Sequence, residues 1–334
     1  SSDLLDPRAE QPVQRWEGDG LRLWVVRRRR ARAVRDAFRL ERQGLLHALK
    51  ESAPEFCHAH WTYEYGLFAV MQKACPAVVS VHDHAAHVLR WAGLQYLPLY
   101  LMTQFVLRKA GRLTAVSPYV QQYIGKITGR SVPVIPNVLA PECYEQADIP
   151  GAQRHGLVSV SQWTRLKNTR TLLRAYAVAR CECSLPPLDL VGPGLDPKGP
   201  AFRWARRHGL AEGVRFLGER SHEWVLHRIR SARMLLHPSR EEAFGMPVAE
   251  AMALGTPVLA CSLAAGPRWL TEDGRWGALV EGHTADAWIH GLVGMGNEPA
   301  WEGTAAGARQ RATSLCDISS VLKRYGASYS GLAR

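Results

Sequence analysis

Short runs of consecutive apolar residues recur along the chain, and most precede a segment whose apolar residues have helical spacing. An apolar run without polar alternation is typical of a strand buried on both faces of a parallel sheet. Residues 1–20 show no such run and no clear period. In the first half, the predicted strands are residues 21–26, 56–60, 77–82, 113–116 and 132–135.

Helices are predicted between these strands. The arginine-rich residues 27–50 have helical spacing, with Leu45 and Leu49 among the inward positions, and residues 65–73 form a second helix. The segment 94–106 is apolar but interrupted, which favours a buried or interfacial helix over a transmembrane one.

The alternation of strand and helix restarts after residue 156. It predicts a second doubly wound α/β sheet, because alternating elements of this kind form a parallel sheet covered by helices. The predicted strands are residues 157–161, 188–191, 214–217, 234–237 and 258–260, and the helices are 170–180, 224–231 and 247–254.

A chain of 334 residues is long for one domain, and the polar segment around Pro141 and Pro150 is the best linker candidate. We therefore expect two Rossmann-like domains with a cleft between their carboxyl edges, where ligands usually bind. The expected divisions are a first domain at 1–140, a linker at 141–156, a second domain at 157–315, and a last helix at 316–334 that crosses back.

The net charge of +12 raises the question of an anionic partner. The densest basic region runs from Arg27 to Arg42. Two interpretations stay open: a solvated basic helix face, or peripheral contact with an anionic membrane. No aromatic and basic interleaving accompanies the run, so nucleic acid is not expected as a partner.

The cysteines predict a reducing compartment. Their number, seven, is odd, their spacing is irregular, and no Cys-x-x-Cys pair occurs, so neither a disulfide framework nor a zinc site is expected. With no visible signal peptide, we expect a cytoplasmic protein, peripheral at the inner face of the membrane if the basic region binds lipid.

The acidic pair Glu242 and Glu250 is the strongest chemical feature. A predicted strand ends before it, and a helix starts near Met246 with Pro247 in its first turn. Gly245 permits close backbone approach to a ligand, and the amides and dipole of a helix N-terminus suit a diphosphate. The two carboxylates therefore contact different parts of one ligand in this hypothesis.

The run from Glu242 to Val258 closely resembles the E-x7-E signature of the retaining glycosyltransferases of family 4. That resemblance implies the GT-B fold, with two doubly wound Rossmann-like domains facing each other across a cleft. It also implies that Glu242 hydrogen-bonds sugar hydroxyls, that Glu250 binds the ribose, and that backbone amides of Phe244, Gly245 and Met246 contact the donor.

A second segment, residues 161–168, is similar to the family's loop that binds the donor diphosphate through an arginine and a lysine. Lys167 matches the lysine, whereas Gln162 stands where the family has arginine, and Arg165 is a candidate substitute. Gly192, in Val-Gly-Pro-Gly after a predicted strand, resembles the family's strand-turn glycines.

The first half carries a thinner resemblance. The strand that ends at His82 and Asp83 is similar to the family's acceptor-domain strand, which implies that His82 faces the reacting sugar carbon. His60 and Trp61 resemble the preceding strand end and, with Asp83, mark the acceptor region. The family's opening strand and Gly-rich loop are not found before Leu21, so the chain is either truncated or divergent there.

The resemblance implies a hexosyltransferase that retains the anomeric configuration. The donor is a nucleoside-diphosphate sugar, and a glycan, a lipid-linked molecule or a small molecule serves as acceptor. No cofactor or metal is expected, because the cations of the site neutralise the leaving group. Two alternatives stay open: a sugar-nucleotide epimerase of the same fold, and a non-catalytic relative that binds nucleotide sugars.

Overall fold

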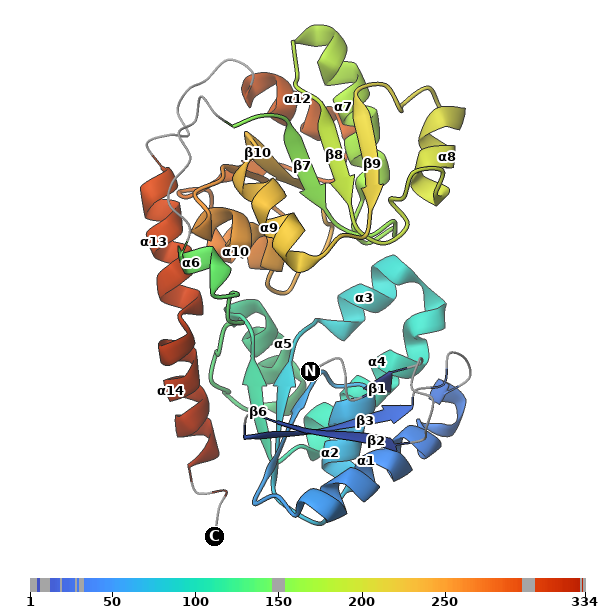
Figure 1. Cartoon of the computed structure of the whole chain (residues 1–334), viewed down its shortest axis with the longest axis vertical. Helices are drawn as coiled ribbons and strands as arrows, with labels where there is room; N and C mark the ends of the chain where they lie inside the picture. Colours follow the sequence, from blue (N-terminus) through green and yellow to red (C-terminus); the bar gives the residue numbers. More distant parts are fainter. Residues whose placement is uncertain are drawn as a thin grey trace. The chain divides into compact units, whose positions relative to one another are not determined.

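The structure is a computed structural model that describes residues 5–6, 13–18, 20–27, 29, 33–145, 154–295, 304–330 and 332. The chain forms two compact units, each built of helices and strands (Figure 1). The first unit comprises Ser1–Ile135 with Arg324–Arg334, and the second comprises Pro136–Lys323.

A parallel sheet of three described strands is the centre of the first unit, in the order β4-β5-β6. The prediction of a further strand at 132–135 is wrong, since only an isolated bridge joins Val134 to Ala115. Pro133 and Pro136 explain this, because proline has no N–H to continue a ladder. The strands are β4 (Cys57–His60), β5 (Ala77–Val81) and β6 (Arg112–Ala115).

Helices pack against this sheet and against one another, with α2 and α5 contacting its strands. The apolar segment 94–106 is half buried, since Val106 is inaccessible while Leu101 and Phe105 are exposed. No described helix is long and apolar enough to cross a membrane. The helices of this unit are η2 (Ala33–Asp36), α1 (Arg39–Ser52), α2 (Glu64–Met71), α3 (Ala85–Ala92), η3 (Leu94–Tyr96), α4 (Leu97–Lys109) and α5 (Pro118–Thr128).

A separate small sheet precedes β4 in the chain. An antiparallel hairpin joins β2 to β3 through a turn in which Gly20 has φ +74°, and β1 pairs with β3 in parallel. The sequence pattern predicts only the strand that begins at Leu21. It misses β2 because most side chains of that strand are exposed on both faces, which leaves no alternation to detect. The strands are β1 (Leu5–Asp6), β2 (Val13–Gly18) and β3 (Leu21–Arg27).

The prediction of a helix from Arg27 onward is wrong, because Arg27 ends β3 and α1 begins at Arg39. Arg29 is not part of a basic helix face. Its guanidinium binds Asp36 at 2.7 Å and the buried carboxylate of Glu41 at 2.7 Å. These charge-assisted bonds join Arg29, two positions after β3, to η2 and to the first turn of α1.

The second unit is built on a six-stranded parallel sheet in the order β12-β11-β10-β7-β8-β9. All five strands predicted from the pattern are present; β12 is the one that was not predicted. The strands are β7 (Leu157–Val160), β8 (Leu188–Val191), β9 (Val214–Gly218), β10 (Met234–His237), β11 (Val258–Cys261) and β12 (Ala278–Val280).

Helices cover this sheet, with α7 packed against α12 and α9 packed against α10 (Figure 1). Trp288 of α12 and Leu172 and Tyr176 of α7 are fully buried in one core with the strands. The helices are α6 (Glu142–Glu145), α7 (Thr169–Glu182), α8 (Pro200–Arg207), α9 (His222–Arg230), α10 (Met246–Ala253), α11 (Ala265–Leu270), α12 (Ala285–Met295) and α13 (Ala305–Cys316). The last helix, α14 (Ile318–Tyr329), begins in this unit and ends in the first.

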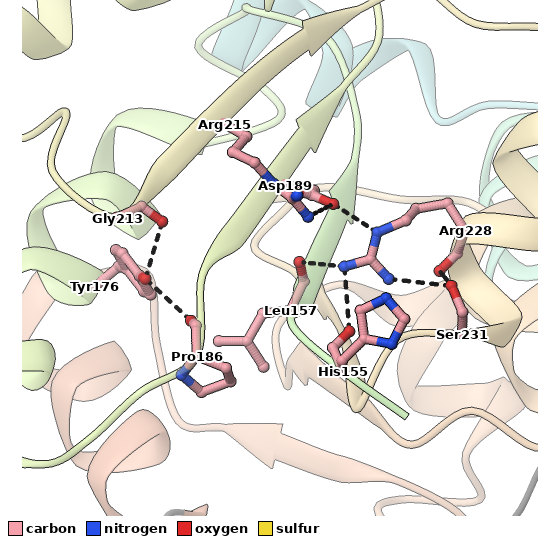
Figure 2. A network of polar contacts seen from close by, with 9 residues as sticks. All are labelled: His155, Leu157, Tyr176, Pro186, Asp189, Gly213, Arg215, Arg228 and Ser231. Atoms are coloured by element: carbon pink, nitrogen blue, oxygen red, sulfur yellow. Dashed lines mark hydrogen bonds and ion pairs between the residues drawn. The ribbon is translucent and has the colours of Figure 1, made fainter. Parts of the chain in front are cut away.

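A buried carboxylate ties the outer strands of this sheet to α9 (Figure 2). Asp189 of β8 is 1% exposed and accepts hydrogen bonds from Arg215 of β9 and Arg228 of α9. Arg228 is itself buried and also donates to the carbonyls of His155 and Leu157. With a further bond to the hydroxyl of Ser231, Arg228 supplies hydrogen bonds to four acceptors, among them the buried carboxylate of Asp189.

We predict that Arg228→Met lowers the free energy of unfolding by about 3 kcal/mol, because it leaves the buried Asp189 and two carbonyls without this donor. The matched variant Arg215→Met, at the exposed side of the same carboxylate, should cost less than about 1 kcal/mol. Urea unfolding of both variants measures the difference. Equal losses would show that Arg228 does not anchor this network.

Candidate functional site

The order of the strands brings the motif loops of the second unit to one edge of the sheet. β7 lies between β10 and β8, and all three run parallel. The segments that follow their carboxyl ends begin at Ser161, Pro238 and Gly192. In parallel α/β sheets this edge is where ligands usually bind.

The central contact of this edge joins two of the predicted donor residues. The ammonium nitrogen of Lys167 lies 2.6 Å from Oε2 of Glu242, and Nε2 of His237 lies 3.3 Å from the same oxygen. Burial alone would raise the pKa of Glu242. The charge of Lys167 and the contact with His237 outweigh that effect and hold the pKa at about 2, so Glu242 is ionised at neutral pH.

Sequence reasoning missed two residues here. His237, at the end of β10, is buried beside Glu242. Arg240 joins the two loops, since its backbone N–H donates to Leu166 and its Nε donates to Asn168 at 3.0 Å. Burial and the nearby charge of Arg165 lower the pKa of Arg240. A search for cations beside the Glu242 motif, as well as within the 161–168 loop, would have found Arg240.

The two residues considered for the missing family arginine lie in the same loop as Lys167. Gln162 and Arg165 are both exposed, and Arg165 is close enough to Arg240 to affect its pKa. Arg165, Lys167 and Arg240 are therefore three cations on or beside this loop, and Glu242 pairs with Lys167.

Gly192 packs closely against the backbone of Ser161, at the start of the 161–168 loop. A Cβ on this residue would lie 1.9 Å from the carbonyl oxygen of Ser161, and its φ of +129° is open only to glycine. Gly192 therefore allows the turn after β8 to touch the loop that carries Lys167.

The start of α10 has the predicted form. Gly245 adopts φ +97° as the residue before the helix, and α10 begins at Met246 without a side-chain cap. Phe244 is buried with its ring edge against Trp269. Pro247 has no N–H, and the N–H groups of Val248 and Ala249 donate to the carbonyl of Gly245. The N-terminal end of α10 carries the positive end of the helix dipole.

Glu250 lies further along the same helix and has a different partner from Glu242. Its Oε1 lies 2.9 Å from Nε2 of His222, the first residue of α9. This hydrogen bond raises the pKa of His222 despite its partial burial. The structure therefore does not join Glu250 to the Lys167–Glu242 pair.

The first unit holds a second polar cluster, made of histidines at the carboxyl ends of β4 and β5. Nδ1 of His60 lies 2.8 Å from Nε2 of His82, and the ring of Trp61 stacks on His82 at 5.1 Å. His58 bonds both Ser80 and Tyr329 at 2.7 Å.

These imidazoles are neutral at pH 7. Burial, reinforced by the other histidines, lowers the pKa of both His58 and His82 to about 3. Asp83 accepts a short hydrogen bond from Tyr63. The structure thus brings together His60, Trp61 and His82, and it holds Asp83 through a neighbouring tyrosine.

Two family models match the chain. The model described as glycosyl transferase 4-like domain matches residues 3–138, and the model described as glycosyl transferases group 1 matches residues 151–295.

Curated relatives match a smaller part. The D-inositol 3-phosphate glycosyltransferase of Streptomyces avermitilis is 37% identical over 143 residues, which is 40% of this chain and 31% of that protein. The protein of that name from Mycolicibacterium paratuberculosis is 34% identical over 143 residues, 41% of this chain and 32% of that protein. The match spans about a third of the length of these relatives.

Solved structures resemble the chain over most of its length. Sucrose-phosphate synthase from Thermosynechococcus elongatus has a TM-score of 0.79 at 20% identity, covering 97% of this chain and 86% of that one. HepE from Anabaena, solved with UDP-glucose, has a TM-score of 0.72 at 21% identity, covering 87% and 82%. At these identities the likeness shows the fold, which is GT-B.

We predict that acid destabilises the first unit through its buried histidines. The unfolded chain binds these protons near the ordinary pKa of 6.5, whereas folded His58 and His82 bind them near 3. Stability is therefore full above about pH 6.5 and falls progressively as the pH decreases toward 3. Urea unfolding between pH 7.5 and 4.5 measures this slope.

The variant His82→Asn should lose less stability over this range than the parent protein. His47→Asn, at an exposed histidine of α1, should keep the parent slope. The same slope in all three proteins would contradict the assignment.

Proposed function

Since the chain belongs to glycosyltransferase family 4, the glycosyl transferases group 1, we propose that it transfers a hexose from a nucleoside-diphosphate sugar to an acceptor hydroxyl. The observation that carries the proposal is the 2.6 Å contact between Lys167 and Glu242. It joins the two motif loops at the sheet edge where α/β proteins bind nucleotides.

In this proposal the cations of the second unit hold the donor diphosphate. Lys167 supplies one charge, and Arg240, which is anchored to the same loop, supplies the second in place of the family arginine at Gln162. The backbone amides of Phe244, Gly245 and Met246, at the N-terminal end of α10, bind the remaining phosphate oxygens. These groups neutralise the leaving group, so the proposed reaction requires no metal.

The two glutamates divide the rest of the donor. Glu242 is ionised and accepts hydrogen bonds from sugar hydroxyls. Glu250 binds the ribose hydroxyls and exchanges His222 for them when the donor enters. The exchange costs little free energy, because the buried carboxylate keeps a hydrogen-bond donor when a ribose hydroxyl takes the place of the imidazole.

His82 is the proposed catalytic group of the first unit. A neutral imidazole hydrogen-bonded to His60 polarises a sugar hydroxyl and stabilises positive charge at the anomeric carbon. We propose that configuration is retained and that the leaving phosphate oxygen takes the acceptor's proton, because no carboxylate pair of the glycosidase kind is assigned.

The acceptor region is proposed at His60, Trp61 and Asp83, beside His82.

Peripheral contact with an anionic membrane through the Arg27–Arg42 region is also proposed. Arg27 and Arg39 are exposed there, while Arg29 is bound to carboxylates. Sedimentation with anionic vesicles at low and high salt tests this contact.

We predict that Lys167→Met and Arg240→Met each weaken UDP binding about 10- to 100-fold, because each removes a charge-assisted bond to the diphosphate. Arg165→Met, at an exposed cation of the same loop, should change the affinity less than about threefold. Titration calorimetry measures all three. A large loss in Arg165→Met alone would assign the second cation to Arg165 and refute the role of Arg240.

We predict that Glu242→Ala and His82→Ala each lower sugar transfer or donor hydrolysis at least about 100-fold, with UDP affinity retained in His82→Ala. His47→Ala, at an exposed histidine, is the matched control. Product analysis with a panel of nucleotide sugars separates the alternatives: an epimerase isomerises the sugar without acceptor, and a non-catalytic relative gives no product. Unchanged transfer and hydrolysis rates in both Glu242→Ala and His82→Ala would refute the proposal.

A further inference from the structure

The first unit encloses a cavity of about 680 Å³ that the donor chemistry does not use. Its wall comes mainly from α1, α2 and β4, and α2 contacts both α1 and β4. The lining side chains include Trp24 of β3, Phe38 directly before α1, Leu45 of α1 and Phe68 of α2. The size is that of a site for a small ligand, and the wall is mostly hydrocarbon.

Several polar side chains of the wall lie close together in the chain. His58, His60 and Trp61 line the cavity at the end of β4, and Glu64 follows at the start of α2. Since His60 contacts His82 at 2.8 Å, the cavity reaches the side chain that holds the proposed catalytic histidine.

An exposed apolar stripe lies on the helix next to this wall. Leu97, Leu101 and Phe105 are each at least 40% exposed and recur every fourth residue of α4, while Leu99 of the same helix lines the cavity. Such a stripe is typical of a helix face that meets an apolar partner or a lipid interface. Leu99 is two positions from both Leu97 and Leu101, so the stripe lies on the opposite side of α4 from the cavity wall.

We propose that the cavity holds the hydrocarbon chain of a lipid-linked acceptor, whose hydroxyl-bearing head lies at His60. An unmodified glycan is a poor occupant, because its hydroxyls would lose water and find few hydrogen-bonding partners along this wall. A hydrocarbon chain gains free energy from every methylene that it buries there. The position of the head rests on the proposed function, whereas binding of the chain does not.

The test measures binding of n-alkyl β-glucosides, from hexyl to dodecyl, to the full chain below their micelle concentrations. Each added methylene should lower Kd up to about fourfold until the cavity is full, with one molecule bound per chain. Equal Kd values for hexyl and dodecyl glucoside would overturn the proposal.

Variants locate the chain within the protein. Ala69→Phe, which fills the cavity from α2, should raise Kd for dodecyl glucoside at least about tenfold, and Ala48→Phe does the same from α1 if the first variant does not fold. His47→Phe, at a side chain that is 67% exposed on α1, should leave Kd unchanged. An unchanged Kd in a folded cavity variant would also overturn the proposal.

UDP calorimetry on the same samples separates this inference from the proposed function. Retained UDP binding with lost glucoside binding in Ala69→Phe supports the cavity assignment and shows that the second unit is folded. Chain-length-dependent glucoside binding in a protein that transfers no sugar would refute the proposed function and leave the cavity assignment standing.

Discussion

The pairing of β7 with β10 on one side and β8 on the other is the constraint on which the donor region depends. It places Lys167 beside Glu242, although 75 positions separate them in the chain. A parallel ladder brings the carboxyl ends of neighbouring strands to one edge of the sheet, so the loops that follow these strands lie together at that edge. Gly192 completes the arrangement, since any larger residue would push the turn after β8 away from Ser161.

Charges of both signs meet at that edge. Glu242 pairs with Lys167, and Arg240 lies close enough to Arg165 for the two charges to repel. A diphosphate would relieve this repulsion and compete with Glu242 for Lys167. In the proposed function, donor binding therefore rearranges an existing ion pair, and the carboxylate released from Lys167 becomes available to sugar hydroxyls.

The polar cluster of the first unit consists of buried histidines instead of ion pairs. Its histidines are buried with hydroxyl groups and with one another, so they stay neutral where an exposed imidazole would titrate. A neutral imidazole both donates and accepts, which lets His60 and His82 share one hydrogen bond. The tyrosines of α14 that contact His58 belong to this unit, although α14 begins in the other.

The sequence by itself determined the α/β class, most of the strands, and the glutamate motif with its helix. Those features are local, since they follow from consecutive apolar residues and from glycine and proline at a helix start. It did not reveal β2, most of whose side chains are exposed on both faces, or the ion pairs of Arg29 with Asp36 and Glu41.

Only the tertiary structure decided which residues meet. The contacts of Arg240 with Asn168, of His222 with Glu250 and of His60 with His82 join segments that are adjacent only after the strands have paired. The cavity lined by His60 likewise exists because α1, α2 and β4 pack around it. Periodicity reports which face of an element is buried, but the partner across that face depends on strand order and register.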